Sequence, residues 1–151
     1  MSAVYSFLDV DATLTAAGAS IDLGYGSAVA GTGIEVSLNN DRNAMTIGAD
    51  GEGMHSLRAD KSGTVTVRLL AISDRNELLQ KLFNAQSLSS STWGANVITI
   101  RNRGNNEITV CRGCAFKRQP TRTYATEGQE AVEWTFDCIK VDTETGSYTQ
   151  I

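Results

Sequence analysis

Apolar and polar residues alternate along several short stretches of this chain. The first stretch, residues 8–14, reads LDVDATL. A period of two predicts half-buried strands, because successive side chains of a strand point to opposite faces of its sheet. The same pattern predicts further strands at residues 34–38, 65–69, 96–101, 107–117 and 131–141, with Gly113 as a bulge. Repeated short strands of this kind indicate an antiparallel sandwich or barrel.

Residues 74–86 depart from this period. Asp74 followed by Glu77 matches a capping box, which marks the start of a helix. The apolar residues that follow recur at helical spacing: Leu78, Leu79, Leu82 and Phe83. We expect one amphipathic helix whose apolar stripe packs on the sheets. The predicted fold class is therefore mainly β, with two packed antiparallel sheets and one flanking helix.

Length and charge limit the classes of protein that fit. A chain of 151 residues predicts a single domain over residues 1–151. It carries 13 basic and 17 acidic residues, a net charge of -4, which disfavours binding to nucleic acid through phosphate contacts. It has no apolar run long enough for a membrane helix, and its first residues lack the features of a signal peptide. We expect synthesis and folding in the cytosol, without membrane insertion.

Two long segments between predicted strands are expected to be extended loops, at residues 16–33 and 39–61. The first is rich in glycine, and the second carries a short apolar patch around Met45 and Ile47. Loops of this length in a small domain are usually functional or disordered. We expect both to be arms that become ordered on a partner, with these candidate contact residues: Gly18, Gly24, Gly26, Met45, Ile47 and His55.

No pattern for catalysis or for a cofactor stands out. His55 is the only histidine, and no G-x-S-x-G nucleophile elbow accompanies it. The glycine pairs near residues 24 and 31 lack the strand-to-helix context of phosphate-binding loops. The basic stretch 117–122 is interpreted as a solvated loop or as one half of an inter-subunit charge pair. We expect neither an enzyme nor a bound cofactor.

The cysteines leave three interpretations open. All three fit as small core residues, which is the favoured reading. Disulfide formation involving Cys111, Cys114 and Cys138, including between subunits, would require release into an oxidising medium. Cys111 and Cys114 also have zinc-knuckle spacing, but a complete site would have to recruit Cys138 and His55 from distant segments.

Several ordered blocks together resemble the tail tube proteins of contractile-tailed bacteriophages. They are YSFLDV (5–10), NAMTIGADGEGMHS (43–56), KSGTVTVRLL (61–70), WGANVITI (93–100), AFK (115–117) and EWTFD (133–137). The resemblance implies a fold shared with the tube protein of the type VI secretion system, assembled as six-membered rings stacked into a hollow tube. It implies a sheath around the tube, baseplate and tail terminator proteins at its ends, and a location in the virion tail. Segment 16–33 would reach the adjacent ring, and segment 39–61 would pack on neighbours.

The resemblance also implies that DNA is a passenger in the lumen. A tube that passes DNA must not hold it, so we expect a neutral or acidic lumen. The acidic residues on polar strand faces are the candidates: Asp9, Asp11, Glu133 and Asp137. Two alternatives remain open. One is a tube subunit of a contractile bacteriocin or a type VI-like secretion system, and the other is a monomeric β-sandwich that binds a ligand in its glycine-rich loops.

Overall fold

The computed structural model describes residues 3–16 and 18–148 of the chain. In chain order, these residues form η1, a short 3-10 helix (Phe7–Asp9), β1 (Val10–Ala16), β2 (Ala19–Asp22), β3 (Val29–Leu38), β4 (Asn43–Ile47), β5 (Gly53–Leu57), β6 (Gly63–Leu70), α1 (Arg75–Gln86), β7 (Asn96–Asn102), β8 (Glu107–Phe116), β9 (Ala131–Cys138) and β10 (Lys140–Glu144). Among them, no helix has the length and apolarity needed to cross a membrane.

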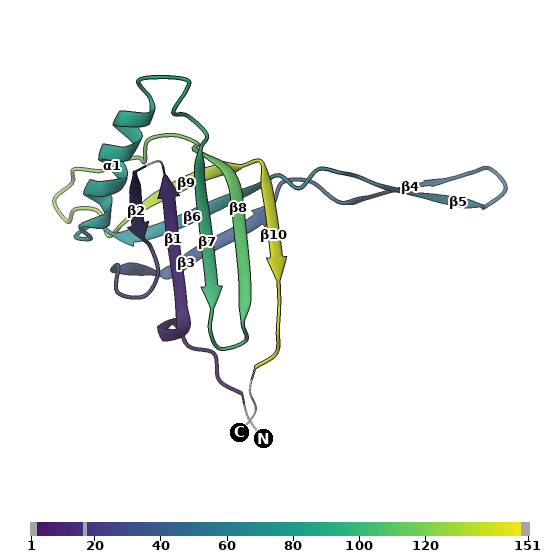
Figure 1. The fold of residues 1–151 in the computed structure, drawn as a ribbon, viewed down its shortest axis with the longest axis horizontal. Helices are drawn as coiled ribbons and strands as arrows, with labels where there is room; N and C mark the ends of the chain where they lie inside the picture. The colour runs from purple at the N-terminus through teal and green to yellow at the C-terminus, as the bar shows by residue number, and fades with distance from the viewer. Residues whose placement is uncertain (1–2, 17, 149–151) are drawn as a thin grey trace.

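Two antiparallel sheets pack against each other. Sheet A contains β2, β1, β7, β8 and β10, and sheet B contains the end of β8 with β9, β6 and β3. Figure 1 shows sheet A in front, with β3, β6 and β9 crossing behind it. The end strands β2 and β3 do not pair with each other in the described part of the chain, so the sandwich is not a closed barrel. The predicted mainly β class, with two packed sheets and one helix, is confirmed.

Strand β8 passes from sheet A to sheet B at a bulge. Asn96 pairs with Cys114 and Ile98 pairs with Cys111, so β8 has one extra residue between these positions. Gly113 lies in the extra stretch with φ of 64°, a conformation that favours glycine. A Cβ atom at this position would lie 3.1 Å from Ile139, at the junction of β9 and β10. The predicted bulge at Gly113 is confirmed. It marks the corner where β8 passes from sheet A to sheet B and where the chain passes from β9 in sheet B to β10 in sheet A.

The core lies between the sheets and beneath α1. Its largest fully buried side chains include Leu14, Val67, Leu69, Leu79, Ile98, Trp134 and Phe136. The ring of Phe116 lies at the centre, with its centroid 4.8 Å from that of Phe136 and 5.5 Å from that of Phe83 on α1. Leu79 is fully buried, whereas Leu78 is 42% exposed. Helix α1 therefore covers one end of the sandwich with most, but not all, of its predicted stripe (Figure 1).

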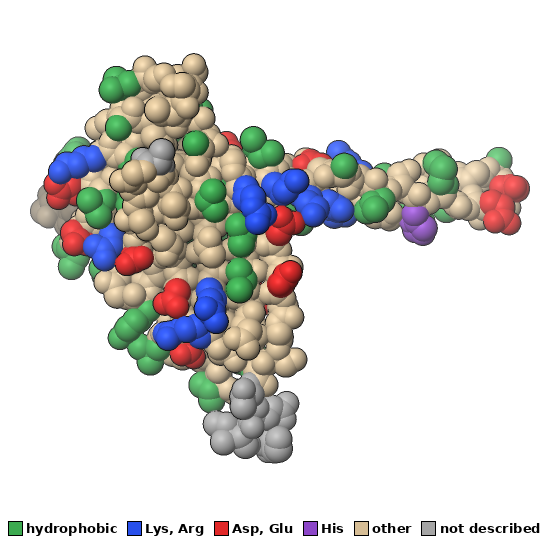
Figure 2. All heavy atoms as spheres, in the orientation of Figure 1, with side chains coloured by type: hydrophobic (Ala, Val, Ile, Leu, Met, Phe, Trp, Pro, Cys, Tyr) green, Lys and Arg blue, Asp and Glu red, His purple; other side chains and the backbone are tan. Residues whose placement is uncertain are grey.

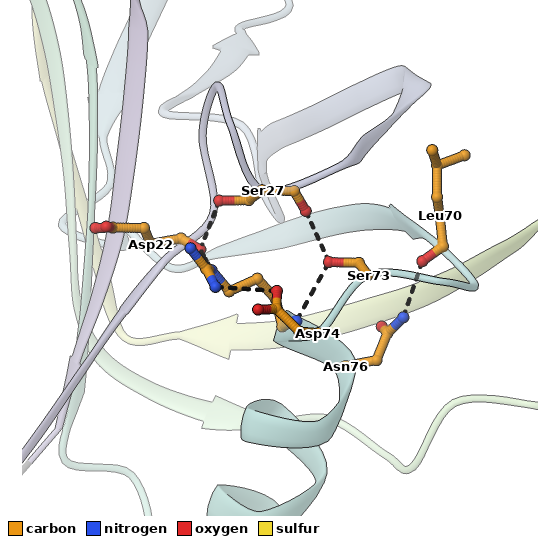
Figure 3. A network of polar contacts seen from close by, with 7 residues as sticks. Asp22, Ser27, Leu70, Ser73, Asp74 and Asn76 are labelled. Carbon is orange, nitrogen blue, oxygen red and sulfur yellow. Dashed lines mark hydrogen bonds and ion pairs between the residues drawn. The ribbon is translucent and has the colours of Figure 1, made fainter.

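The start of α1 is held by a polar network that differs from the predicted capping box. Asp74 already has helical backbone angles and makes no side-chain capping bond, because a capping side chain requires extended backbone at that residue. Instead, the Ser73 hydroxyl accepts the N–H of Arg75 at 3.2 Å and donates to the Ser27 carbonyl at 2.7 Å (Figure 3). The capping-box prediction was wrong, although the helix begins within one residue of the predicted position.

Replacing Asn76 with alanine is expected to lower the free energy of unfolding by about 2–3 kcal/mol. The Asn76 side chain donates to the Leu70 carbonyl at 2.9 Å and accepts the indole N–H of Trp134 at 3.0 Å, and both side chains are buried. The change leaves that buried indole N–H without its partner. Urea unfolding measures the loss. Asn84→Ala, at an exposed position of the same helix, is the matched control and should shift stability by no more than about 0.5 kcal/mol.

Candidate assembly surfaces

Strands β4 and β5 form a hairpin, residues 43–57, that projects from the sandwich and is called the arm below (Figure 1). The two strands pair only with each other in the described part of the chain, and every residue in them is exposed. A lone two-stranded hairpin is at best marginally stable in water. The arm therefore has the properties of an element that packs on another surface.

One face of the arm is strongly apolar. Met45 lies opposite His55 and Ile47 lies opposite Gly53, so these side chains share a face with Leu57. Met45, Ile47 and Leu57 are 62%, 55% and 80% exposed. The tip carries two carboxylates, from Asp50 and Glu52, seen at the far end of the arm in Figure 2. Three of the predicted contact residues, Met45, Ile47 and His55, thus lie together on this face.

Asp60 organises the base of the arm. Its carboxylate accepts the N–H of Ser62 at 2.8 Å and the side-chain amide of Asn40 at 2.6 Å, and its carbonyl accepts from Arg42 at 3.4 Å. Hydrogen bonds with Ser62 are the main cause that lowers the pKa of Asp60 to about 2, with Asn40 contributing. The ionised carboxylate therefore fixes the two chain segments from which the arm departs.

Low pH is expected to break the hydrogen bonds that Asp60 makes at the base of the arm. Because the pKa of Asp60 is about 2 when folded and 3.8 ordinarily, its hydrogen bonds are complete above about pH 4 and are lost as pH falls through about 2. The Ser62 amide resonance should titrate near pH 2 in NMR spectra, and Asp60→Ala should remove this titration. Asp41→Ala, at an exposed neighbour, should leave it unchanged. A midpoint near pH 4 in the unmodified protein would contradict the assignment.

The outer side of sheet B, called face B below, carries hydroxyls and carboxylates. Its outward side chains are Glu35, Ser37, Thr64, Thr66, Arg68, Glu133, Thr135 and Asp137. Arg68 is the one cation among these residues, and it contacts Glu133 at 3.1 Å and Glu35 at 3.4 Å. Lys117 lies beside Thr135 on the same side, because its N–H donates to the Thr135 carbonyl where the register of β8 with β9 continues. Three carboxylates against two cations leave face B with a small acidic excess.

The outer side of sheet A, called face A below, has mixed charge. Its outward side chains include Asp11, Thr13, Thr15, Asp22, Val97, Thr99, Arg101, Ile108, Val110, Arg112, Lys140 and Asp142. Three ion pairs lie here: Asp142 contacts Arg112 at 2.9 Å and Lys61 at 3.0 Å, and Asp11 contacts Arg103, in the turn after β7, at 3.2 Å. Figure 2 views this side, where basic and acidic groups lie next to each other.

The four acidic candidates for the lumen separate onto two sides of the molecule. Glu133 and Asp137 lie on face B, Asp11 lies on face A, and Asp9 is in η1, just before β1. Because the two faces lie on opposite sides of the core, the four residues cannot all line a lumen formed by one face. Sequence reasoning missed Glu35 and Arg68 on face B. The alternation of residues 34–38 and 65–69 carried the signal for both.

The predicted loop at residues 16–33 is wrong. The described residues of this segment include β2 and the beginning of β3, joined by the turn at residues 23–28. Gly24 is buried against β1, where a Cβ would lie 2.7 Å from backbone atoms of Ala12 and Val10. It therefore serves close packing within the subunit, whereas Gly18 and Gly26 lie exposed in turns with positive φ. Segment 39–61 does extend outwards, but mostly as the paired strands of the arm.

A groove of about 860 Å³ opens between β3 and the inner side of sheet A. Its apolar lining includes Val10, Ile34, Val36, Ile100 and Val141. Strand β3 has β6 as its single neighbour in the described residues, so its other edge borders this groove.

The basic stretch 117–122 lies away from this groove. In it, Arg122 donates to Gln80 of α1 at 2.6 Å.

All three cysteines are free thiols within the core. Cys111 and Cys114 are fully buried and Cys138 is 4% exposed. His55 lies on the arm, so the zinc set of three cysteines and His55 is not assembled. Among residues 3–16 and 18–148, no group of three or more histidine, cysteine, aspartate or glutamate side chains is arranged to hold a metal ion. The interpretation of the cysteines as core residues is confirmed.

Comparison with protein families identifies the chain. The model of the bacteriophage PhiTE tail tube protein family matches residues 1–146. The chain belongs to this family. The resemblance stated from the sequence blocks is thereby confirmed, and this tail tube family is one of structural proteins. No curated protein sequence matches the chain.

Solved structures confirm the tail tube fold. The sheath-tube complex of the PVC extracellular contractile injection system in its extended state contains a chain with a TM-score of 0.60 and 15% identity, covering 94% of this chain and 92% of that one. The PVC sheath/tube terminator has a TM-score of 0.63 at 12% identity, over 95% and 99%. The tube-terminating cap of the anti-feeding prophage has a TM-score of 0.60 at 10% identity, over 97% and 94%.

Proposed function

We propose that this tail tube protein assembles into six-membered rings that stack into a hollow tube and conduct DNA during ejection. The match of residues 1–146 to a phage tail tube family carries the proposal. The sheath surrounds this tube, and baseplate and tail terminator proteins bind its ends. The named neighbours come from sheath-tube and terminator structures, and a further similar chain comes from the baseplate structure of the anti-feeding prophage, which supports these partners. The protein is made in the host cytoplasm and resides in the virion tail.

The arm provides the contacts between subunits in this proposal. Rings close through heterologous contacts, and the same contacts repeated along an axis build a filament. The apolar face of the arm, formed by Met45, Ile47 and Leu57, is the surface that a neighbour covers. The exposure of these side chains in the single subunit supports this role. Gly18 and Gly26, in exposed turns, remain candidates for weaker contacts.

Face B lines the lumen in this proposal. A lumen rich in lysine and arginine would grip the phosphates of a long DNA along its whole length. Face B offers hydroxyls, three carboxylates and two cations, Arg68 and Lys117, and Arg68 is paired with Glu133 and Glu35. Face A carries three cations on its strands, Arg101, Arg112 and Lys140. Glu133 and Asp137 therefore face the DNA, together with Glu35. Asp11 is assigned to the other side, towards the sheath, and Asp9, in η1, is assigned to neither face.

Electron microscopy of concentrated protein in negative stain tests the proposal. We expect rings with sixfold symmetry or stacked tubes. A protein that stays monomeric at high concentration would contradict the proposal and favour the ligand-binding β-sandwich. The likeness to injection-system structures supports a second candidate, a tube that carries no DNA, at the level of fold alone. Neighbouring genes for capsid and terminase proteins would distinguish a phage from such a particle.

A further inference from the structure

We propose that Cys114 and Cys138 form a disulfide bond within one subunit when the protein meets a small disulfide oxidant, and that Cys111 remains a free thiol. The Sγ atoms of Cys114 and Cys138 lie 2.7 Å apart. They come from the consecutive strands β8 and β9, are 24 residues apart in the sequence, and meet at the corner between the sheets. This inference concerns the isolated subunit and does not depend on tube assembly.

The strand register brings the two cysteines opposite each other. Ala115 pairs with Asp137 and Phe116 pairs with Phe136, so the next position pairs Cys114 with Cys138. The Lys117 N–H donates to the Thr135 carbonyl, and the alternation of an antiparallel ladder then makes the cysteines a non-hydrogen-bonded pair. Side chains in such pairs lie closest together. A disulfide needs about 2.05 Å between the sulfurs, which requires a movement of less than about 1 Å.

The position of the pair gives the bond a structural consequence. Cys114 ends the pairing of β8 with β7 in sheet A, and Cys138 pairs with Gly63 of β6 in sheet B. The bond would therefore join the two sheets at the corner formed by β8 and the end of β9, beside Gly113 and Ile139. It would also close the chain segment from 114 to 138, including the irregular loop between β8 and β9. Closing a loop restricts the unfolded chain and stabilises the fold.

The chemistry is thiol–disulfide exchange with a small disulfide such as oxidised glutathione. One cysteine thiolate attacks the small disulfide and forms a mixed disulfide with one half of it. The other half leaves as one equivalent of small thiol. The second cysteine thiolate then displaces the other small thiol, so two cysteines are oxidised as one small disulfide is reduced. The two protons pass to the released thiols. The reducing cytosol disfavours this reaction, and an oxidising medium outside the cell favours it.

Cys111 is the competing thiol, and it has a distinct environment. A hydrogen bond from Cys138 lowers the pKa of Cys111, while the pKa of Cys138 is raised by its contacts with Cys111 and Cys114. The Cys114 thiol also contacts the Cys111 carbonyl at 3.2 Å. In the strand register, Cys111 lies opposite Ile98 on β7 and Val141 on β10, so Cys111 and Cys138 touch without being a cross-strand pair. That register favours Cys114 as the partner of Cys138.

The test treats the purified protein with oxidised glutathione and counts thiols after denaturation. We expect one free thiol, a Cys114–Cys138 crosslinked peptide in a mass-spectrometric digest, and a Tm about 5–10 °C higher than in the reduced protein. Cys111→Ala should keep the crosslink and the Tm increase, and Cys114→Ala should lose both. Three remaining thiols, a Cys111–Cys138 crosslink or a link between subunits would each overturn the proposal. The digest of the unmodified protein decides this even if a variant fails to fold.

Discussion

Replacing both Met45 and Ile47 with aspartate is expected to prevent tube assembly while the subunit stays folded. The two carboxylates would be buried without partners in each contact that the apolar face of the arm makes, and such burial costs several kcal/mol. A loss of about 3 kcal/mol per contact raises the protein concentration needed for assembly roughly 100-fold. The fold should not change, because the strands of the arm pair only with each other in the described residues.

Sedimentation and electron microscopy over a range of concentrations measure this effect, and thermal unfolding checks the subunit. The Tm should stay within about 2 °C of that of the unmodified protein. Ala44→Asp with Thr46→Asp places the same charges on the opposite face of the arm and is the matched control. We expect this control to need at most about tenfold more protein for assembly. Normal tubes from the Met45 and Ile47 variant would show that this face is not a contact surface.

The strands that bury one face were predictable from the sequence, and the others were not. Strand β6 alternates buried and half-buried side chains along its whole length, so its period of two reflects contact with the core. Strand β2 and the first half of β3 consist mostly of small residues, and their pairing depends on close approach to other strands, as at Gly24. Strands β4 and β5 have no buried face, so no burial pattern could reveal them.

The candidate surfaces required the topology as well as the pattern. Asp11 and Glu133 each alternate with buried apolar residues, but the sequence pattern does not reveal that their strands belong to opposite sheets. The proximity of Cys114 to Cys138 depends on the extra residue in β8, which shifts the register of one strand end. The long-range strand pairing fixes both arrangements, and local periodicity carries no information about it.

Replacing Ser37 and Asp137 with lysine is expected to make assembled tubes hold DNA in the lumen. These residues flank Thr64 in one row across β3, β6 and β9 on face B, and both are exposed. Every subunit would then add two cations to the lumen, and the cations would repeat in each ring. Because each lysine–phosphate contact releases counterions, binding should be strong at low salt and fall steeply as salt rises.

Nuclease protection distinguishes DNA in the lumen from DNA on the outside of the tube. Tubes are mixed with short double-stranded DNA, treated with nuclease and sedimented. The face B variant should retain at least about ten times more protected DNA than unmodified tubes at low salt. Thr15→Lys with Asp22→Lys adds the same charges to face A, and DNA bound by that control should sediment but remain open to digestion. Protection by the face A control, and none by the face B variant, would instead assign the lumen to face A. The orientation of the subunit in the ring follows from whichever variant protects the DNA, since the two faces lie on opposite sides of one core.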